Sequence, residues 1–365
     1  MQPTRHPHSM DPRIRDHAET IVEHSAGVEA SDDVIVYLPS NAEDLGVALH
    51  ELLGQKGANP LFLTYSERAE RAFLRNSDEF ETPDHELALY ENADVTIIAR
   101  SGPNPSEKAD VDPETTAAYN RAHDPVKKAR LDTTWCLTQH PSSGYAQLAG
   151  MSTEEYEEFV YDAVSLDWDA QRERQSNLVD ILNEGSEVRI RAGKETDVTM
   201  SIEGNTAAND YGEANLPGGE VFTAPVKDSV EGTVHFDLPL YRQGREVQDA
   251  RVTFENGRVT EFSAGRNEDV LTGVFETDEA ARYLGELGIG MNDAIDRFTS
   301  NMLFDEKMDE TVHMAVGSAY PQCVGEGNEV NDSAEHVDMI LDMSEDSVIE
   351  VDGEVVQENG AFIFD

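Results

Sequence analysis

The chain is poor in basic residues, and this shortage argues against two classes of partner. Lys and Arg together number 27 in a chain of 365 residues, whereas Asp and Glu number 74 and the formal net charge is -47. Nucleic acids and anionic membrane surfaces are both bound through clusters of Lys and Arg. We therefore expect neither a nucleic-acid partner nor a membrane partner.

Cysteine and long apolar runs are also scarce. Cys136 and Cys323 are the only cysteines in the sequence, and they form no Cys-x-x-Cys pair. Two isolated cysteines are too few for a zinc-thiolate site, so we interpret them as free thiols in a reducing cytoplasm. No segment approaches the roughly 20 consecutive apolar residues that a membrane-spanning helix needs. The first ten residues also lack the apolar segment of a signal peptide.

Acidic residues, in contrast, are abundant along the whole chain, and only seven of the basic residues are Lys. An acidic, lysine-poor composition resembles that of proteins from salt-accumulating halophiles. The Debye length is ~3 Å in molar salt and ~10 Å at 0.1 M. The mutual repulsion of the carboxylates is therefore largely screened only in concentrated salt.

We predict that the protein loses stability steeply as salt is removed. Each kcal/mol of lost stability lowers the melting temperature of a large domain by roughly 2–4 °C. Thermal melts should be recorded from molar potassium chloride down to about 0.1 M, where screening has weakened. A melting temperature that does not change over this range would contradict a halophilic origin.

Residues 10–150 alternate between strand-like and helix-like patterns. Apolar, β-branched runs predict four strands, at residues 32–39, 59–66, 93–101 and 133–141. Residues 41–58 have leucines at helical spacing and begin with Asn41, a candidate N-cap. Alternation of this kind predicts an N-terminal α/β domain with a parallel sheet covered by helices. We expect residues 1–9, which precede it, to form a disordered tail.

The remainder of the chain predicts a helical bridge and then a β-rich domain. Residues 151–185 are mostly helical, with Ser152 or Thr153 as the cap of the first helix. Residues 186–365 contain short alternating strands, with strong hairpin signals at Asn256-Gly257 and Asp352-Gly353. We therefore expect a mostly antiparallel C-terminal domain, interrupted by one helix at residues 278–288.

Three glycines lie at the C-terminal end of that expected helix and just after it, at Gly285, Gly288 and Gly290. Their spacing does not fit a Gly-x-Gly-x-x-Gly phosphate loop, and they end a helix instead of opening one. We interpret them as a glycine-capped helix terminus. No glycine-rich loop follows residues 32–39 either, which argues against a nucleotide-dependent enzyme.

The pattern His-x-Asp occurs twice, at His235 with Asp237 and at His336 with Asp338. Residues i and i+2 of a strand face the same way, so either pair could present two ligand atoms together. Either could equally be the polar face of a half-exposed strand. The spacing within the pairs is identical and leaves both interpretations open.

Five motifs in the second half provide context for one of these pairs. They are Asn215-Leu216-Pro217 with Gly219-Glu220-Val221, Gly285-Glu286 with Gly288-Ile289-Gly290 and Asn292, Glu306-Lys307 with Thr311 and His313, Gly317 with Tyr320-Pro321, and Asn331 and Ser333 with His336 and Asp338. In this order they resemble the M29 family of metalloaminopeptidases. The first half of the chain is similar to that family in outline.

The resemblance implies a centre of two divalent metal ions, which could be Zn, Co, Mn or Mg. The matching ligands are Glu220, Glu286, His313, Tyr320, His336 and Asp338. Three carboxylates, two imidazoles and a phenol are a suitable donor set for two such cations. A phenol can join the set when the cations lower its pKa. No residue of the family's ligand set matches His235 or Asp237.

The same resemblance implies an activity, in which metal-activated water attacks a peptide carbonyl. A carboxylate must then move a proton to the leaving amine, and Glu286 and Glu306 are both candidates for this general base. The implied substrates are short peptides with a free N-terminus, which enter the enclosed cavity of a homodimer. The alternative is a non-catalytic metal- or peptide-binding protein that retains the fold. One departure is Glu310, where the family has Gly before the Thr of its Gly-Thr-x-His motif.

Overall fold

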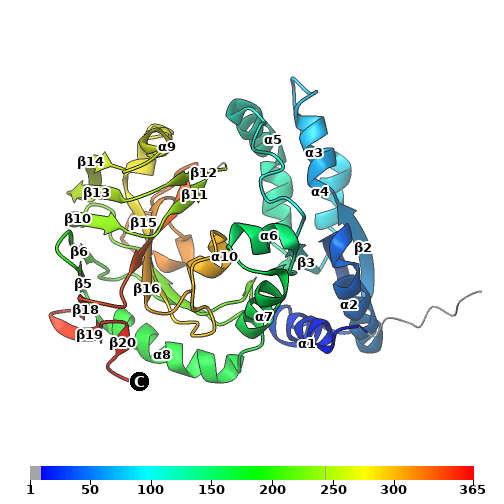
Figure 1. Cartoon of the computed structure of the whole chain (residues 1–365), viewed down its shortest axis with the longest axis horizontal. Helices are drawn as coiled ribbons and strands as arrows, with labels where there is room; N and C mark the ends of the chain where they lie inside the picture. The colour runs from blue at the N-terminus through cyan, green and yellow to red at the C-terminus, as the bar shows by residue number, and fades with distance from the viewer. Residues whose placement is uncertain (1–9, 243) are drawn as a thin grey trace, which may run out of the picture. The chain divides into compact units, whose positions relative to one another are not determined.

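The computed structural model describes residues 10–242 and 244–365, so the tail predicted at residues 1–9 lies outside the described residues. The chain divides into two compact units. One comprises Met1–Ser165 with Gly212–Leu216, and the other comprises Leu166–Tyr211 with Pro217–Asp365. The first contains a parallel sheet and the second contains antiparallel sheets, which confirms the predicted fold class (Figure 1).

The sheet of the first unit has five strands, and all of its pairings are parallel. Their order is β2 (Asn59–Tyr65), β1 (Asp33–Pro39), β3 (Val95–Arg100), β4 (Thr134–Gln139) and β8 (Asn215–Leu216). Its helices are α1 (Pro12–Thr20), α2 (Glu43–Lys56), α3 (Glu67–Leu74), α4 (Asp84–Tyr90), α5 (Pro113–Leu131), α6 (Ser143–Leu148) and α7 (Thr153–Val164). The four strands predicted in this half of the chain are therefore confirmed.

The predicted cap of α2 is wrong. A short 3₁₀ turn, Ser40–Ala42, precedes the helix, and Ala42 occupies the cap position without a side-chain hydrogen bond. Asn41 instead donates from Nδ2 to Ser101 Oγ, which follows β3, at 2.6 Å. The cap predicted at Ser152 is confirmed, because its Oγ accepts from the amide of Glu155 at 3.1 Å.

The second unit begins with α8 (Trp168–Glu184) and continues as two large antiparallel sheets and a two-stranded one, β11 (Leu240–Arg242) with β12 (Arg245–Val247). The larger has the order β14 (Arg258–Ser263), β13 (Ala250–Glu255), β10 (Glu231–Phe236), β6 (Thr196–Ser201), β5 (Glu187–Ala192), β18 (Ser347–Val351), β19 (Glu354–Glu358) and β20 (Ala361–Phe362). The smaller has the order β17 (His336–Asp342), β16 (Thr311–Gly317), β15 (Leu284–Gly290), β9 (Glu220–Thr223) and β7 (Ala208–Asp210).

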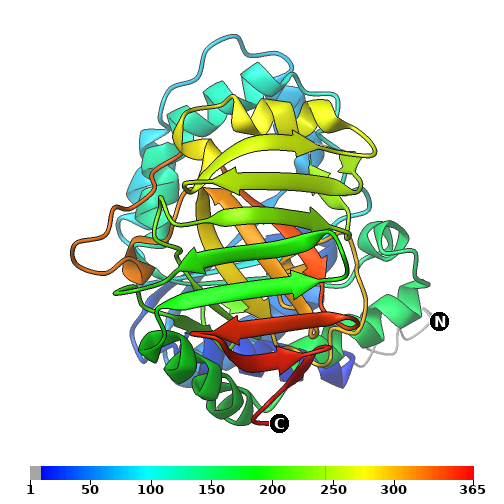
Figure 2. The ribbon, with the colours of Figure 1, turned by 90° about the vertical axis from the view of Figure 1, so that its left-hand side faces the viewer.

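These two sheets pack face to face as a sandwich, with the larger sheet in front in Figure 2. Val234 and Phe236 of β10 belong to the same buried cluster as Leu287 and Ile289 of β15. Apolar area removed from water stabilises a fold by roughly 25 cal/mol per Å². The shared core therefore holds the smaller sheet firmly in place, and the candidate ligands lie on that sheet.

Both predicted hairpins are confirmed by their backbone angles. Asn256 and Gly257 have φ of 50° and 76° between β13 and β14, and Asp352 and Gly353 have φ of 51° and 82° between β18 and β19. Two consecutive residues with positive φ are the signature of a type I′ turn.

The helix predicted at residues 278–288 is wrong. Only a 3₁₀ turn, Ala280–Arg282, forms there, and the chain then enters β15, whose seven residues are all buried. A strand covered on both faces lacks the alternation that identifies half-exposed strands, so its pattern can be mistaken for a helix. The helix of this region lies earlier, as α9 (Glu268–Phe275).

Among the helices of residues 10–242 and 244–365, none has the length and apolarity that a membrane span requires.

Candidate metal centre

Four neighbouring strands of the smaller sheet carry the candidate ligands. Glu220 begins β9, Glu286 lies in β15, His313 in β16, and His336 and Asp338 in β17. These strands are adjacent in the order β17, β16, β15, β9. Pairing of the strands therefore brings together side chains that are far apart in the sequence.

The five side chains form two groups that share one member. His313 Nε2 lies 3.1 Å from Glu220 Oε2 and 3.5 Å from Glu286 Oε1. His336 Nε2 lies 3.2 Å from Glu286 Oε2 and 3.7 Å from Asp338 Oδ1. In each group the ligand atoms lie within 4.8 Å of one another. Glu286 thus presents one oxygen to each group, as a carboxylate that bridges two cations would.

The donor set fits divalent cations. Glu220 and Glu286 are 5% and 4% exposed, so both carboxylates are withdrawn from water. Glu220 Oε2 makes no hydrogen bond of acceptable geometry with any residue that the structure describes. Buried carboxylates require compensating charge, and imidazole nitrogens with carboxylate oxygens are the ligands that Zn, Co and Mn accept.

The pKa values of the candidate ligands are shifted because several charged groups lie close together in the site. Burial works against the charged form of His336, but Glu286 and Asp338 raise the pKa of the imidazole to about 10. Burial also disfavours ionised Glu286, yet His313 and His336 lower its pKa to about 2. Protons on the imidazoles thus provide the charge that cations can also provide, so metal binding has to displace them.

Tyr320, the sixth predicted ligand, follows β16 and lies beside the second group. Its ring centroid is 5.3 Å from that of His336. Tyr320 is 42% exposed, but partial burial of its phenol and the nearby charges of Glu286 and Glu306 raise its pKa above the ordinary value. The phenol is therefore neutral among these protein groups, and it could ionise only when cations offset the carboxylates.

Glu306 follows α10 (Met302–Asp305) and belongs to neither ligand group, but its carboxylate and that of Glu220 contact the same ammonium, Lys307 Nζ. Burial raises the pKa of its carboxyl, Lys307 lowers it and Glu220 raises it, with a net value of about 7. A group whose pKa lies near 7 can both accept and donate a proton at neutral pH.

Two supporting residues were absent from the predicted site. Lys307 has no exposed surface, and its Nζ lies 3.1 Å from Glu220 Oε1. Gln175 of α8 is also fully buried and donates from Nε2 to the carbonyl oxygens of Glu220 and Asp210, at 2.9 and 3.0 Å. The sequence around Lys307 is highly charged, and only its apolar neighbours Phe304 and Met308 indicate burial.

The glycines of β15 allow close approach between elements of the site. A Cβ at Gly288 would overlap Nε2 of His313, and a Cβ at Gly290 would overlap the carbonyl oxygen of Met308. A Cβ at Gly285 would likewise overlap the carbonyl oxygen of Gly317. The interpretation of these residues as a helix cap is therefore wrong, because they leave room for a ligand and for adjoining backbone.

We predict that Gly288→Ala displaces His313 and weakens metal binding. Mutations that disturb the support of a ligand typically cost 10–100-fold in metal affinity or activity, so we expect turnover to fall by about 10–100-fold. Bound metal, measured by mass spectrometry, should fall in parallel. Gly273→Ala in α9 is the matched control, because a Cβ there meets nothing within 4 Å. Unchanged metal content in Gly288→Ala would contradict this account.

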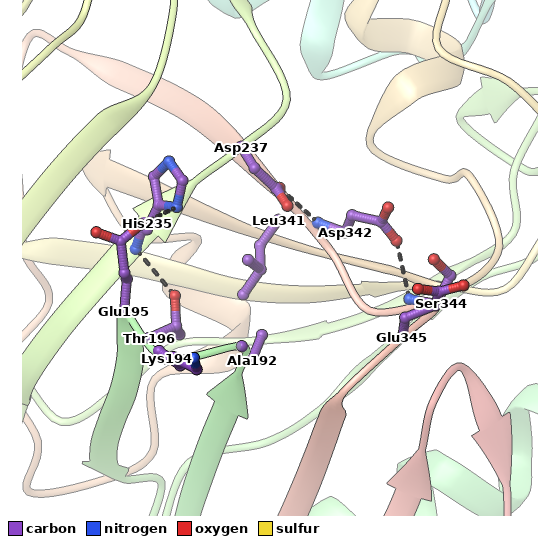
Figure 3. A pocket seen from close by; sticks show the side chains of 11 residues that line it. Ala192, Lys194, Glu195, Thr196, His235, Asp237, Leu341, Asp342, Ser344 and Glu345 are labelled. Atoms are coloured by element: carbon purple, nitrogen blue, oxygen red, sulfur yellow. Dashed lines mark hydrogen bonds and ion pairs between the residues drawn. The ribbon is translucent and has the colours of Figure 1, made fainter.

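The second His-x-Asp pair lies in different surroundings, which Figure 3 shows. His235 of β10 and Asp237 line a cavity of about 480 Å³ together with Glu195 and Asp342. His235 Nδ1 lies 3.3 Å from Glu195 Oε2, and Asp237 Oδ1 accepts from the amide of Asp342 at 2.9 Å. Neither ligand group found among the described residues includes His235 or Asp237.

Glu310 occupies a backbone conformation that explains why glycine suits this position. Its φ is 58°, in the left-handed region that side chains other than glycine seldom adopt. Its side chain is exposed, and its carbonyl oxygen accepts from the amide of Met343 at 2.8 Å. Glu310, which stands where the family has Gly, therefore lies in the turn that leads into β16.

Comparisons with known proteins identify the family of the chain. A family model described as thermophilic metalloprotease (M29) matches residues 10–362. Aminopeptidase AmpS of Bacillus subtilis (strain 168) is 27% identical over 413 residues, which cover 98% of this chain and 100% of that protein. Aminopeptidase T of Thermus aquaticus is 27% identical over 387 residues, which cover 92% of this chain and 93% of that protein.

The fold of the chain also matches a solved structure. Wild-type AmpT from Thermus thermophilus is similar with a TM-score of 0.85 and 25% identity, over 96% of this chain and 99% of that chain. The family resemblance read from the five motifs is thereby confirmed. The chain belongs to the M29 family of thermophilic metalloproteases and is a hydrolase that acts on peptides.

Proposed function

We propose that the protein is an aminopeptidase that uses two divalent cations to remove N-terminal residues from short peptides. The observation that supports this most directly is the position of Glu286, whose two oxygens each face a different histidine. The relatives named as aminopeptidases support the substrate class.

The ligands divide naturally between two cations. Glu220 and His313 would hold one, His336 and Asp338 would hold the other, and Glu286 would bridge them. Tyr320 lies beside the second group and would complete its coordination. When bound, the two cations would polarise the scissile carbonyl and lower the pKa of the attacking water.

Of the two candidate bases, we favour Glu306. Both oxygens of Glu286 face imidazoles, and its low pKa suits a permanent ligand. Glu306 has a pKa of about 7 and lies beside the ligand groups. It would accept the proton of the attacking water and donate it to the leaving amine.

We predict cleavage only from a free N-terminus, because an exopeptidase must bind the substrate's α-amine. A site that hydrogen-bonds a substrate NH group rejects analogues that lack it by 10⁴–10⁵-fold. An amino-acid anilide and its N-acetylated form should be compared at equal concentration, in molar salt with added metal. Equal rates would refute aminopeptidase action. Metal binding without hydrolysis of either compound would favour the non-catalytic binding protein instead.

The cellular context remains part of the proposal. The formal charge of -47 supports an origin in a salt-accumulating cell, and the two buried cysteines, neither of which forms a disulfide, support a reducing cytoplasm. We also propose that the active form is a homodimer, as the family resemblance implies. Light scattering in molar salt would distinguish a dimer from a 40.3 kDa monomer.

A further inference from the structure

Lys307 lies among three carboxylates and is completely shielded from solvent. Its ammonium is 3.1 Å from Glu220 Oε1 and 3.7 Å from Asp210 Oδ2, and it donates a hydrogen bond to Glu306 Oε1. An ammonium has three N–H donors and no acceptor, so it can serve one carboxylate with each donor. Lysine is almost never fully buried without such pairing.

The backbone fixes this lysine against β15. The amide of Lys307 donates to the carbonyl of Phe304 at 2.9 Å, and its own carbonyl accepts from the amide of Asn292 at 3.0 Å. Gly290 lacks the Cβ that would overlap the carbonyl of Met308. These contacts hold the backbone of Lys307, and the three carboxylates hold its ammonium.

We propose that Lys307 is a positioning residue that assigns different tasks to the acidic side chains of the metal centre. It occupies Oε1 of Glu220, which leaves only Oε2 to bind a cation beside His313. By binding Glu306 it keeps that carboxylate out of the ligand set and available for proton transfer. The inference rests on the proposed dinuclear centre and adds a residue to it.

If Lys307 has this role, removal of its ammonium should raise the affinity for metal and lower turnover. The ammonium repels any cation held by the other oxygen of Glu220, so its removal should tighten metal binding. The same removal frees Glu306 and the second oxygen of Glu220 to act as ligands, so turnover should fall. A lysine that merely supported the fold would lose metal and turnover together when replaced.

The test is Lys307→Met, which keeps the length of the side chain and removes its charge. Zinc affinity, measured by competition with a chromophoric chelator, is expected to rise at least about 10-fold, which corresponds to 1.4 kcal/mol. Turnover is expected to fall at least about 100-fold. The absorption spectrum of the cobalt-loaded protein should change in the direction that indicates a higher coordination number of the cobalt ion. Lys194→Met, at an exposed lysine, is the matched control and should alter none of these.

A charge-balanced double variant, Glu306→Gln with Lys307→Met, separates the proposal from a failure to fold. Its zinc affinity should return towards that of the wild type, because Glu306→Gln removes both the liberated ligand and one negative charge, while turnover stays low. Parallel loss of metal and turnover in folded Lys307→Met, or full turnover in it, would overturn the proposal. So would failure of both variants to fold in saturating zinc. Wild-type protein that binds no metal would instead refute the dinuclear centre.

Discussion

Replacing His336 by Ala is expected to lower turnover by at least about 1,000-fold, whereas His235→Ala leaves it unchanged. Both histidines begin the same His-x-Asp pattern, but only His336 faces Glu286, at 3.2 Å from Oε2. Its Nδ1 lies 2.8 Å from the carbonyl oxygen of Ser318, which fixes the ring with Nε2 towards the carboxylates. Loss of a direct ligand should cost more than the 10–100-fold typical of its supporting residues.

His235 provides the matched control for that experiment. It is half-buried in a different part of the sandwich and pairs with Glu195 and Asp249. Removing such a side chain should change the free energy of unfolding by no more than about 0.5 kcal/mol and leave bound metal unaffected. The placement of the centre is wrong if His235→Ala loses its metal and His336→Ala does not.

Exhaustive removal of metal is expected to abolish hydrolysis and to lower the melting temperature. A ligand present at 100 times its dissociation constant stabilises the folded state by ≈ 2.7 kcal/mol, so chelation removes about that much. Added cobalt, zinc or manganese should restore activity, with about two ions bound per chain. Chelator-treated protein that retains full activity without metal would rule out the proposed mechanism.

Measurement of bound metal can also test directly whether Glu286 bridges the two ions. Glu286→Gln should release both ions, because Glu286 is the member common to the two ligand groups. Asp338→Asn should release only the ion beside His336, because Asp338 belongs to the second group alone. Equal metal loss in the two variants would indicate that Glu286 does not bridge.

Local patterns in the sequence were sufficient to predict most strands. The runs around β1, β3 and β4 are short, apolar and β-branched, and turn residues bound them, so each could be assigned without knowledge of its neighbours. The hairpin at Asn256-Gly257 is equally local, since its turn requires positive φ at both residues. These features depend on residues that are adjacent in the chain.

Features that depend on contacts with residues far away in the sequence could not be predicted from local patterns. The glycines of β15 are needed because His313 and Met308 approach them from elsewhere in the fold. Asn41 was misassigned because its partner, Ser101, follows a different strand. The burial of Lys307 is not evident from its charged neighbours, because the carboxylates that surround it, apart from Glu306, come from distant segments. The candidate ligand set itself is predicted only through the family motifs, because its members come from four separate strands.

The central strands of the smaller sheet, β15 and β16, are buried at all seven residues each. Their amides should therefore exchange with solvent hydrogen only through openings close to global unfolding. Glu286 and His313 belong to these two strands, so the ligands cannot separate while the rest of the domain stays folded. The assembly of the centre and the folding of the sandwich are thus one cooperative event, and a native-like state without an organised ligand set should not accumulate.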